Sequence, residues 1–145
     1  MSKFDSGKRV MSGTWGEVWL DNEYVAEAFR FSARISYSKA PIPRCGSMAS
    51  DHKVTGYSGS GSIGMHKISS RMARLIGEKI RNGEDVRFTI ISKLDDPDAY
   101  GQERVRITGV SFDDLTIADW EVNTPGKVES PFTFTDYDFL DAVEV

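Results

Sequence analysis

A glycine pattern associated with nucleotide binding lies near the middle of the chain. Residues Gly59 to Gly64 (GSGSIG) have the spacing G-x-G-x-x-G, which in dinucleotide-binding proteins forms the turn between a buried strand and a helix. Here Met65 to Lys67 separate the glycines from the predicted helix, and the preceding DHKVTGYS is not an apolar core strand. The acid expected about 20 residues later would be Glu84, at the start of a strand. The pattern therefore predicts a strand with very small side chains on both faces, as found where another backbone approaches closely or a surface must stay smooth.

Residue types that bind metals or perform catalysis are present, but without the required spacing. The potential ligands are Cys45, Asp51, His52 and His66. No two of them have i, i+4 spacing on a helix, so exposed or hydrogen-bonded histidines are expected. A second group, Asp95, Asp96 and Asp98, lacks the glycine and closing glutamate of a calcium loop and indicates a solvated turn. No serine lies in a nucleophile elbow. We expect no catalytic residue, no metal and no cofactor.

Charge is distributed unevenly along the chain. Residues 1–94 hold 15 Lys and Arg against 9 Asp and Glu, a net +6, whereas residues 95–145 hold 3 against 13, a net −10. Such a division suits a solvated surface or copies that meet head to tail. The total of −4 argues against general DNA binding. Basic side chains that could contact nucleic acid are therefore expected to keep outer surfaces soluble; they are Arg30, Arg34, Arg71, Arg74, Lys79 and Arg81.

The length of 145 residues suits one domain, 1–145, with a single core. The N-terminal MSKFDSGKRV has no apolar segment, and no apolar run approaches the roughly 20 residues needed to span a bilayer. We expect a protein made in a cytoplasm. A single cysteine excludes an internal disulfide framework, so the fold must depend on packing.

Alternating patterns predict long strands in the first half of the chain. Gly13 to Leu20 is predicted as a strand, and Asp21-Asn22 as a tight hairpin turn. From Glu23 to about Ser38 one face is expected to be buried, with Val25, Phe29, Phe31, Ala33, Ile35 and Tyr37, and the other wet, with Ala28, Arg30, Ser32, Arg34 and Ser36. Val54 to about Lys67 alternates likewise, placing Ser58, Ser60, Ser62 and His66 opposite Tyr57, Ile63 and Met65.

Between these strands, about residues 39–53, two prolines and small polar residues without periodicity predict a long loop, a feature that is usually functional or ordered by a partner. An apolar stripe of Ile68, Met72, Leu75, Ile76 and Ile80 predicts a helix at about 69–82, capped by Ser69 or Ser70 and ended by Asn82-Gly83. Four strands are predicted after it: Val86 to Leu94, Glu103 to about Phe112, Leu115 to Asn123 and Val128 to Thr135. The fold class is mostly β (α+β), with one amphipathic helix against a sheet.

Four stretches in this order carry a family resemblance: MSGTWGEVWLD (11–21), SSRMARLIGEKI (69–80), FDDLTIADWE (112–121) and PFTFTDYDFLD (131–141). Together they resemble the tail tube proteins of contractile-tailed phages, of the type found in defective prophages and phage tail-like (R-type) bacteriocins of Gram-positive bacteria. The resemblance extends from about Val10 to the C-terminus. It implies an antiparallel β-sandwich or barrel-like tail tube fold and hexameric rings that stack into a hollow tube within a contractile sheath.

The resemblance also implies partners and a location. These are further copies of the chain, the tail sheath protein, a baseplate or tube initiator, a tail terminator, DNA or ions as non-specific cargo, and a target cell envelope reached by the assembled particle. The particle would assemble in the bacterial cytoplasm and leave by lysis. Four strands from each of six subunits make about 24 strands, which at roughly 4.8 Å spacing and 40° tilt gives a backbone diameter of about 50 Å.

Two groups of residues are candidates for roles in such a tube. The wet face of small and polar side chains suits a lumen: Arg30, Ser32, Arg34, Ser36, Ser58, Ser60 and Ser62. The predicted loop is a candidate for reaching a neighbouring ring through Pro41, Ile42, Pro43, Arg44, Met48 and His52. The change of charge along the chain would then set the polarity of stacking.

Two other functions remain open at this stage. A monomeric β-rich module that binds carbohydrate or nucleic acid would need an exposed aromatic platform, whereas the tryptophans fall within strand patterns and are expected in the core or an interface. An enzyme would need titratable groups that converge in a pocket.

Overall fold

The computed structural model describes residues 6–70 and 73–143 of the chain. Its eight strands are β1 (Gly16–Leu20), β2 (Glu23–Tyr24), β3 (Ala28–Pro43), β4 (Ser50–His66), β5 (Phe88–Leu94), β6 (Glu103–Phe112), β7 (Lys127–Phe134) and β8 (Asp136–Asp141). The helical segments are η1 (Gly7–Arg9), η2 (Gly13–Trp15), η3 (Ala73–Gly77) and α1 (Glu78–Arg81). The predicted fold class, mostly antiparallel β with a flanking helix, is confirmed.

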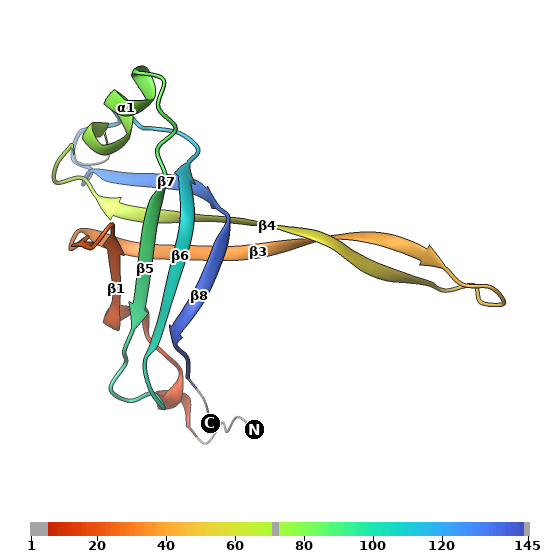
Figure 1. Cartoon of the computed structure of the whole chain (residues 1–145). Coiled ribbons are helices and arrows are strands. Elements are labelled where there is room, and N and C mark those ends of the chain that lie inside the picture. The colour runs from red at the N-terminus through yellow and green to blue at the C-terminus, as the bar shows by residue number, and fades with distance from the viewer. Residues whose placement is uncertain (1–5, 71–72, 144–145) are drawn as a thin grey trace.

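The strands form two layers that share β6 and run across each other (Figure 1). The first layer has the order β2-β1-β5-β6-β8, and the second contains β3, β4, β7 and the last residues of β6. Within β6, Thr108 still pairs with β8 whereas Ser111 pairs with β7. Gly109, with φ of 69°, lies between these two pairings and allows the change of direction. The chain makes a second corner at Thr135, between β7 and β8.

The core lies between the two layers and is dominated by phenylalanine. Phe132 is fully buried, and its ring centroid lies 5.9 Å from that of Phe31, 6.0 Å from Phe112 and 6.1 Å from Phe134. From the first layer, Ile90 and other buried aliphatic side chains complete the core: Val18, Leu20, Ile107 and Val110. These contacts hold the second layer, which carries the surfaces described below, against the first.

The glycine pattern lies within β4 and has a packing role. Gly59 pairs with Phe134 and Gly61 with Phe132 across the β4–β7 ladder. A Cβ on Gly59 would lie 2.6 Å from Phe134 Cδ2, and one on Gly61 would lie 2.8 Å from Phe132 Cζ. The absent side chain of Gly59 therefore leaves space for the Phe134 ring. That of Gly61 leaves space both for Phe132 and for the backbone carbonyl of Ser32 on β3, which would be the nearest atom, while the intervening serines occupy the other face. The predicted strand is confirmed, and the spacing of its glycines follows the core aromatics.

Two turn predictions are confirmed by backbone geometry. Asp21 and Asn22 have φ of 47° and 69° and join β1 to β2, so both residues of the two-residue hairpin are left-handed. Gly83, with φ of 82°, follows α1. Within the described residues, helical structure covers Ala73 to Arg81, and residues 69, 70 and 82 of the predicted helix are not helical; Arg71 and Met72 lie outside the described residues. Of its predicted stripe, Ile76 is buried and Leu75 half-buried, but Ile68 and Ile80 are exposed.

Several predicted boundaries are wrong. Residues 13–15 form the turn η2 instead of the start of a strand, and the strand expected from Glu23 is divided into β2 and β3. The loop expected at 39–53 is a continuation of β3 and β4, which leaves only residues 44–49 as a turn. The segment expected as a strand from Leu115 to Asn123 is irregular, since none of the described strands pairs with it, and β8 was not predicted. None of the described helices is long and apolar enough to cross a membrane.

Candidate functional site: a polar sheet face and a projecting hairpin

The seven candidate lumen residues, which were predicted to lie on solvent-exposed strand faces, lie on the same side of the sheet formed by β3 and β4. Antiparallel partners that stand directly opposite lie on the same side of a sheet. Across β3 and β4 the pairs are Ser32 with Ser62, Arg34 with Ser60, and Ser36 with Ser58. On β7, Glu129 pairs with Gly64, Pro131 with Ser62 and Thr133 with Ser60. We call this surface the polar sheet face; it consists of Arg30, Ser32, Arg34, Ser36, Ser58, Ser60, Ser62, Glu129 and Thr133.

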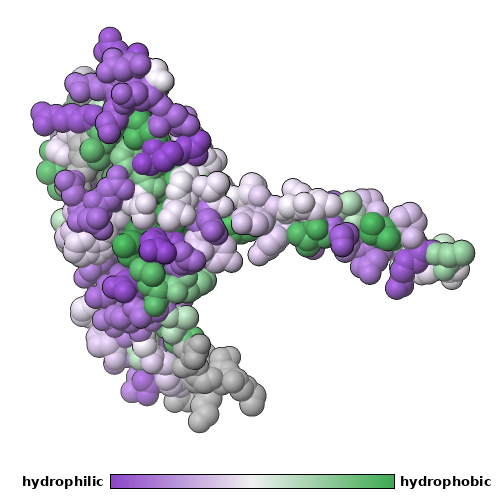
Figure 2. Space-filling model, in the orientation of Figure 1, coloured by the Kyte–Doolittle hydropathy of each residue, from purple (hydrophilic) through white to green (hydrophobic). Residues whose placement is uncertain are grey.

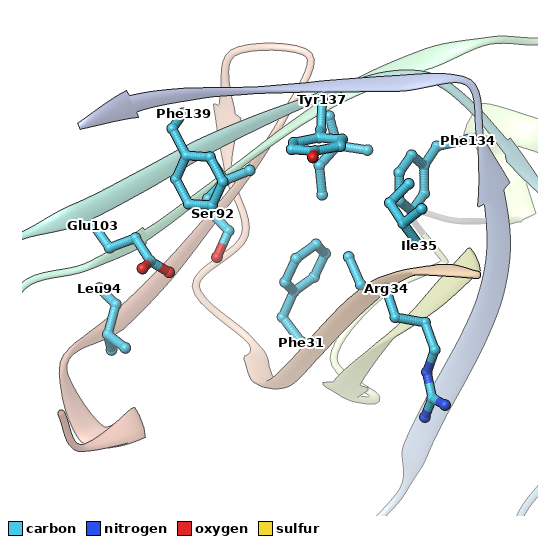
Figure 3. Close-up of a pocket in the computed structure, with 12 residues that line it drawn as sticks. Phe31, Arg34, Ile35, Ser92, Leu94, Glu103, Phe134, Tyr137 and Phe139 are labelled. Atoms are coloured by element: carbon cyan, nitrogen blue, oxygen red, sulfur yellow. The ribbon is translucent and has the colours of Figure 1, made fainter. Parts of the chain in front are cut away.

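The charges on the polar sheet face are few. Arg30 donates a hydrogen bond from Nη2 to the Ser62 hydroxyl at 2.8 Å and forms an ion pair with Glu129 at 3.3 Å. Arg34 extends away from the Phe31 side of β3 (Figure 3). Among the described residues it has no ion-pair partner within 4 Å. The face is therefore dominated by hydroxyl groups, with one cation that no described carboxylate pairs with. The exposed Phe29 ring, which lies over Gly64 and beside His66, is a large apolar group at one end of it.

The expected buried face of β3 is buried only in part. Phe31 and Ile35 pack against the core, but Phe29, Ala33 and Tyr37 are exposed. Phe29 departs from the alternation because a bulge separates the pairs of Ala28 and Arg30. Its ring lies 4.9 Å from that of His66 and 5.4 Å from Lys127 Nζ, two residues that pair with each other on the ladder. The prediction for Phe29 was therefore wrong.

Beyond the end of β7, strands β3 and β4 continue as an isolated ribbon. The last pair between β4 and β7 is Gly59 with Phe134, so residues 37–57 pair only with each other. We call this segment the hairpin arm. Figure 1 shows it projecting from the body of the molecule, and at about 3.3 Å per residue its strands extend roughly 20–25 Å. All of its residues except Ala40 and Gly56 are exposed.

The residues predicted to contact a neighbouring ring all lie on this arm. Pro41 and Pro43 pair with His52 and Ser50, and Arg44 and Met48 belong to the turn. Exposed apolar side chains occur along the arm among polar ones (Figure 2), namely Tyr37, Ile42, Met48, Val54 and Tyr57. An isolated two-stranded hairpin is marginally stable in water at best. An arm of this length with exposed apolar groups is therefore a surface suited to contact with another chain.

A groove of about 460 Å³ lies between β3 and the first layer. Figure 3 shows Phe31 and Ile35 on one side, Tyr137 and Phe139 of β8 on another, and Glu103 near the mouth. Glu103 is the one carboxylate among the described lining residues, and the Arg34 guanidinium points away. The groove is therefore mainly apolar and does not bring acid, base and nucleophile together.

The potential metal ligands lie apart. Cys45 is exposed in the turn of the arm, whereas His52 and His66 lie near opposite ends of β4. No cluster of three metal-ligand side chains occurs within residues 6–70 and 73–143. Asp96 is buried, and its carboxylate accepts hydrogen bonds from the backbone N–H groups of Ser12 at 3.0 Å and Asp98 at 2.9 Å. It therefore fastens the N-terminal segment to the turn after β5.

The remaining candidate residues do not gather into one surface. Arg30 and Arg34 lie on β3, and Arg74, Lys79 and Arg81 belong to η3 and α1; Arg71 is outside the described residues. The tryptophans were expected in strands, but only Trp19 lies in one. Trp15 is exposed in η2, and Trp120 is exposed in the irregular connection before β7. The exposure of Trp120 was not predicted, because residues 115–123 were expected to form a strand.

Crossed antiparallel layers, a polar face and a long exposed hairpin define a β-rich structural subunit with open surfaces. The chain belongs to the phage tail tube protein family, whose sequence model matches residues 4–141. It is 33% identical over 133 residues to the phage-like element PBSX protein XkdM of Bacillus subtilis (strain 168), with 90% of each chain covered. The family resemblance found in the sequence is thus confirmed, and the family is one of structural proteins.

Solved structures of contractile injection systems contain the same fold. A chain in the PVC sheath–tube complex of an extracellular contractile injection system, in its extended state, aligns with a TM-score of 0.74 at 12% identity, covering 97% of this chain and 100% of that one. A chain in the tube terminating cap of the anti-feeding prophage aligns with a TM-score of 0.73 at 12% identity, covering 97% of each. At this identity the similarity establishes the fold.

Proposed function

We propose that this chain forms stacked hexameric rings that build the inner tube of a contractile phage tail or tail-like bacteriocin. The tube would be a conduit for DNA or ions, and the chain would act as a structural subunit and not as an enzyme. Its further partners would be the sheath protein, a baseplate or initiator complex and a terminator. The assembled particle, released by lysis, would engage the target envelope.

The observation that supports this proposal most strongly is the second layer. It contains four strands, β3, β4, β7 and the end of β6, and it presents the polar sheet face. Among the described strands β3 pairs only with β4, so its other edge, along a strand of 16 residues, presents outward-facing backbone groups that no described strand pairs with. Such an edge is an aggregation hazard unless another strand covers it, and closing a ring covers every edge at once.

The polar sheet face suits the lumen of that ring. Its serines and threonine offer hydroxyl groups to water, and these small side chains leave the middle of the wall smooth between Arg34 and the Phe29 ring. The opposite face of the same layer carries Phe31, Ile63 and Phe132, which the first layer covers. A ring closed with the polar sheet face inward therefore leaves the first layer outward, where the sheath would lie. The hairpin arm, which extends beyond the four-stranded part, would contact a neighbouring ring.

Cysteine labelling tests this orientation. In a Cys45→Ser background, Ser60→Cys places a thiol on the polar sheet face, and Asp138→Cys places a matched thiol on exposed β8. Both thiols should react with a bulky maleimide in the monomer. In assembled tubes Ser60→Cys should become protected from a maleimide coupled to a large polymer, while Asp138→Cys stays reactive. Equal reactivity of the two thiols in tubes would refute the orientation.

A further inference from the structure

The connection between β6 and β7 has an unusual surface. Residues 113–122, which we call the acidic connection, contain Asp113, Asp114, Asp119 and Glu121 and no basic residue. Its apolar side chains are mostly uncovered: Ile117 is 77% exposed, Trp120 81% and Val122 73%. Large apolar side chains exposed this far, beside carboxylates, are typical of a protein-binding surface, and tryptophan often dominates the binding energy there.

The backbone of the acidic connection is also free to pair. Asp113 donates to the Pro131 carbonyl at 2.9 Å, and Thr124 donates to the Glu121 carbonyl at 3.3 Å. Between residues 114 and 120, no backbone hydrogen bond to any described residue is present. The same residues have the alternation typical of a strand, with Leu115 and Ile117 two apart. A segment of strand-like sequence without a partner is suited to receive an edge from another chain.

The hairpin arm is complementary to this surface. Residues 37–57 contain Lys39, Arg44 and Lys53 against Asp51, a net +2, together with the exposed apolar groups named above. The two surfaces also lie at opposite ends of the second layer. The acidic connection leads into Lys127, which pairs with His66 at one end of β4, whereas the arm, residues 37–57, extends beyond Gly59 at the other end (Figure 1).

We propose that the hairpin arm of one copy docks on the acidic connection of another copy. Because the two surfaces differ and lie at opposite ends of the second layer, the contact is heterologous and can repeat without closing, as the stacking of rings requires. The inference rests on the proposed function and names the surface that receives the arm. It predicts that Lys39 and Lys53 face Asp119 and Glu121 across the contact, and that Trp120 is covered.

A charge-exchange experiment on the full chain tests the contact. The first variant is Asp119→Lys/Glu121→Lys, the second is Lys39→Glu/Lys53→Glu, and the third combines all four substitutions. Glu78→Lys/Glu84→Lys, at exposed positions near α1, is the control with the same change in net charge as the first. The minimum protein concentration for ring or tube formation is measured by sedimentation and negative-stain microscopy. Circular dichroism of the monomers confirms that each variant is folded.

The first and second variants should each raise the minimum concentration about tenfold or more at low salt, because several opposite charges become like charges. The minimum concentration of the combined variant should return to within about threefold of the wild-type value, and that of the control variant should also lie within about threefold of it. The docking inference fails, and the tube proposal stands, if either double variant assembles at the wild-type concentration. It also fails if the combined variant needs as high a concentration to assemble as the double variants do. If the wild type forms neither rings nor tubes at any concentration, the proposed function fails, and the inference with it.

Discussion

Replacing Gly59 by alanine is expected to destabilise the monomer by about 2 kcal/mol, within the range of about 1–3 kcal/mol for overpacking a core. The added Cβ would lie 2.6 Å from both Cδ2 and Cζ of Phe134, closer than packed carbon atoms approach. Phe134 is itself buried beside Phe132, so its ring has little room to move. A loss of this size lowers the midpoint of thermal unfolding by about 4–8 °C in a domain of this length.

The same strand supplies a matched control. A Cβ added to Gly56, which lies on the arm, would meet no atom within 4 Å, so Gly56→Ala should be neutral or slightly stabilising. The assay is urea unfolding followed by circular dichroism at a concentration where light scattering shows a monomer. In a Phe134→Leu background the cost of Gly59→Ala should fall by at least about 0.5 kcal/mol, because the ring is gone. Equal stability of the two alanine variants, or an unchanged cost without the ring, would refute the packing argument.

Changes at Asn22, Asp96 and Glu129 and in the hairpin arm give four further expected outcomes. Asn22→Ala should cost about 1 kcal/mol in urea unfolding and Asn22→Gly nothing, because residue 22 has φ of 69°; equal effects would contradict the turn geometry. Asp96→Ala should cost about 1–3 kcal/mol, since the N–H groups of Ser12 and Asp98 lose their acceptor, and an unaffected midpoint would show that water replaces it fully. Glu129→Gln should change stability by less than about 0.5 kcal/mol at physiological salt, because its ion pair with Arg30 is about half exposed; a larger loss would mean the pair is stronger than its exposure indicates. Replacing residues 38–56 with Asn-Gly should keep the unfolding midpoint within a few degrees but abolish assembly, measured by sedimentation, whereas retained assembly would exclude a role for the arm.

The polar sheet face could be predicted because it depends on local periodicity. Serines and arginines alternate with apolar or glycine residues over both long strands, and pairing in register brings the two alternations to one side. The Asp21-Asn22 turn was predictable for the same reason, since its conformation is a property of the two residues themselves. The family resemblance added the assembly, which no local pattern contains.

The wrong predictions of strands and loops occur where pairing between distant parts of the chain determines the local conformation. Prolines and glycine in residues 41–46 indicate a loop. Pro41 and Pro43 nevertheless fit an edge strand, because no described strand on the outer side of β3 offers a carbonyl that would need an N–H from these residues. Residues 115–123 alternate like a strand, but no described residue pairs with them as a neighbouring strand. The corner at Thr135 is a single residue, so β8 could not be separated from β7 by turn signals.

The bulge at Phe29 shows a further limit of periodicity. One extra residue between two ladder pairs moves a ring from the core side to the side of His66, and no residue type in the sequence marks the position. Assigning residues to the two faces of a strand from sequence alternation is therefore correct within a segment that has no bulge, but the assignment fails when the segment crosses a bulge.

A cryo-electron microscopy map of the assembled protein, grown from the purified chain over a concentration series, would show whether and how the copies form a tube. We expect a hollow tube with six copies in each ring, with Arg34 and Ser60 on the inner wall and each hairpin arm against a copy in the next ring. A map with these residues on the outer wall, or with arms that contact no other copy, would contradict this expectation.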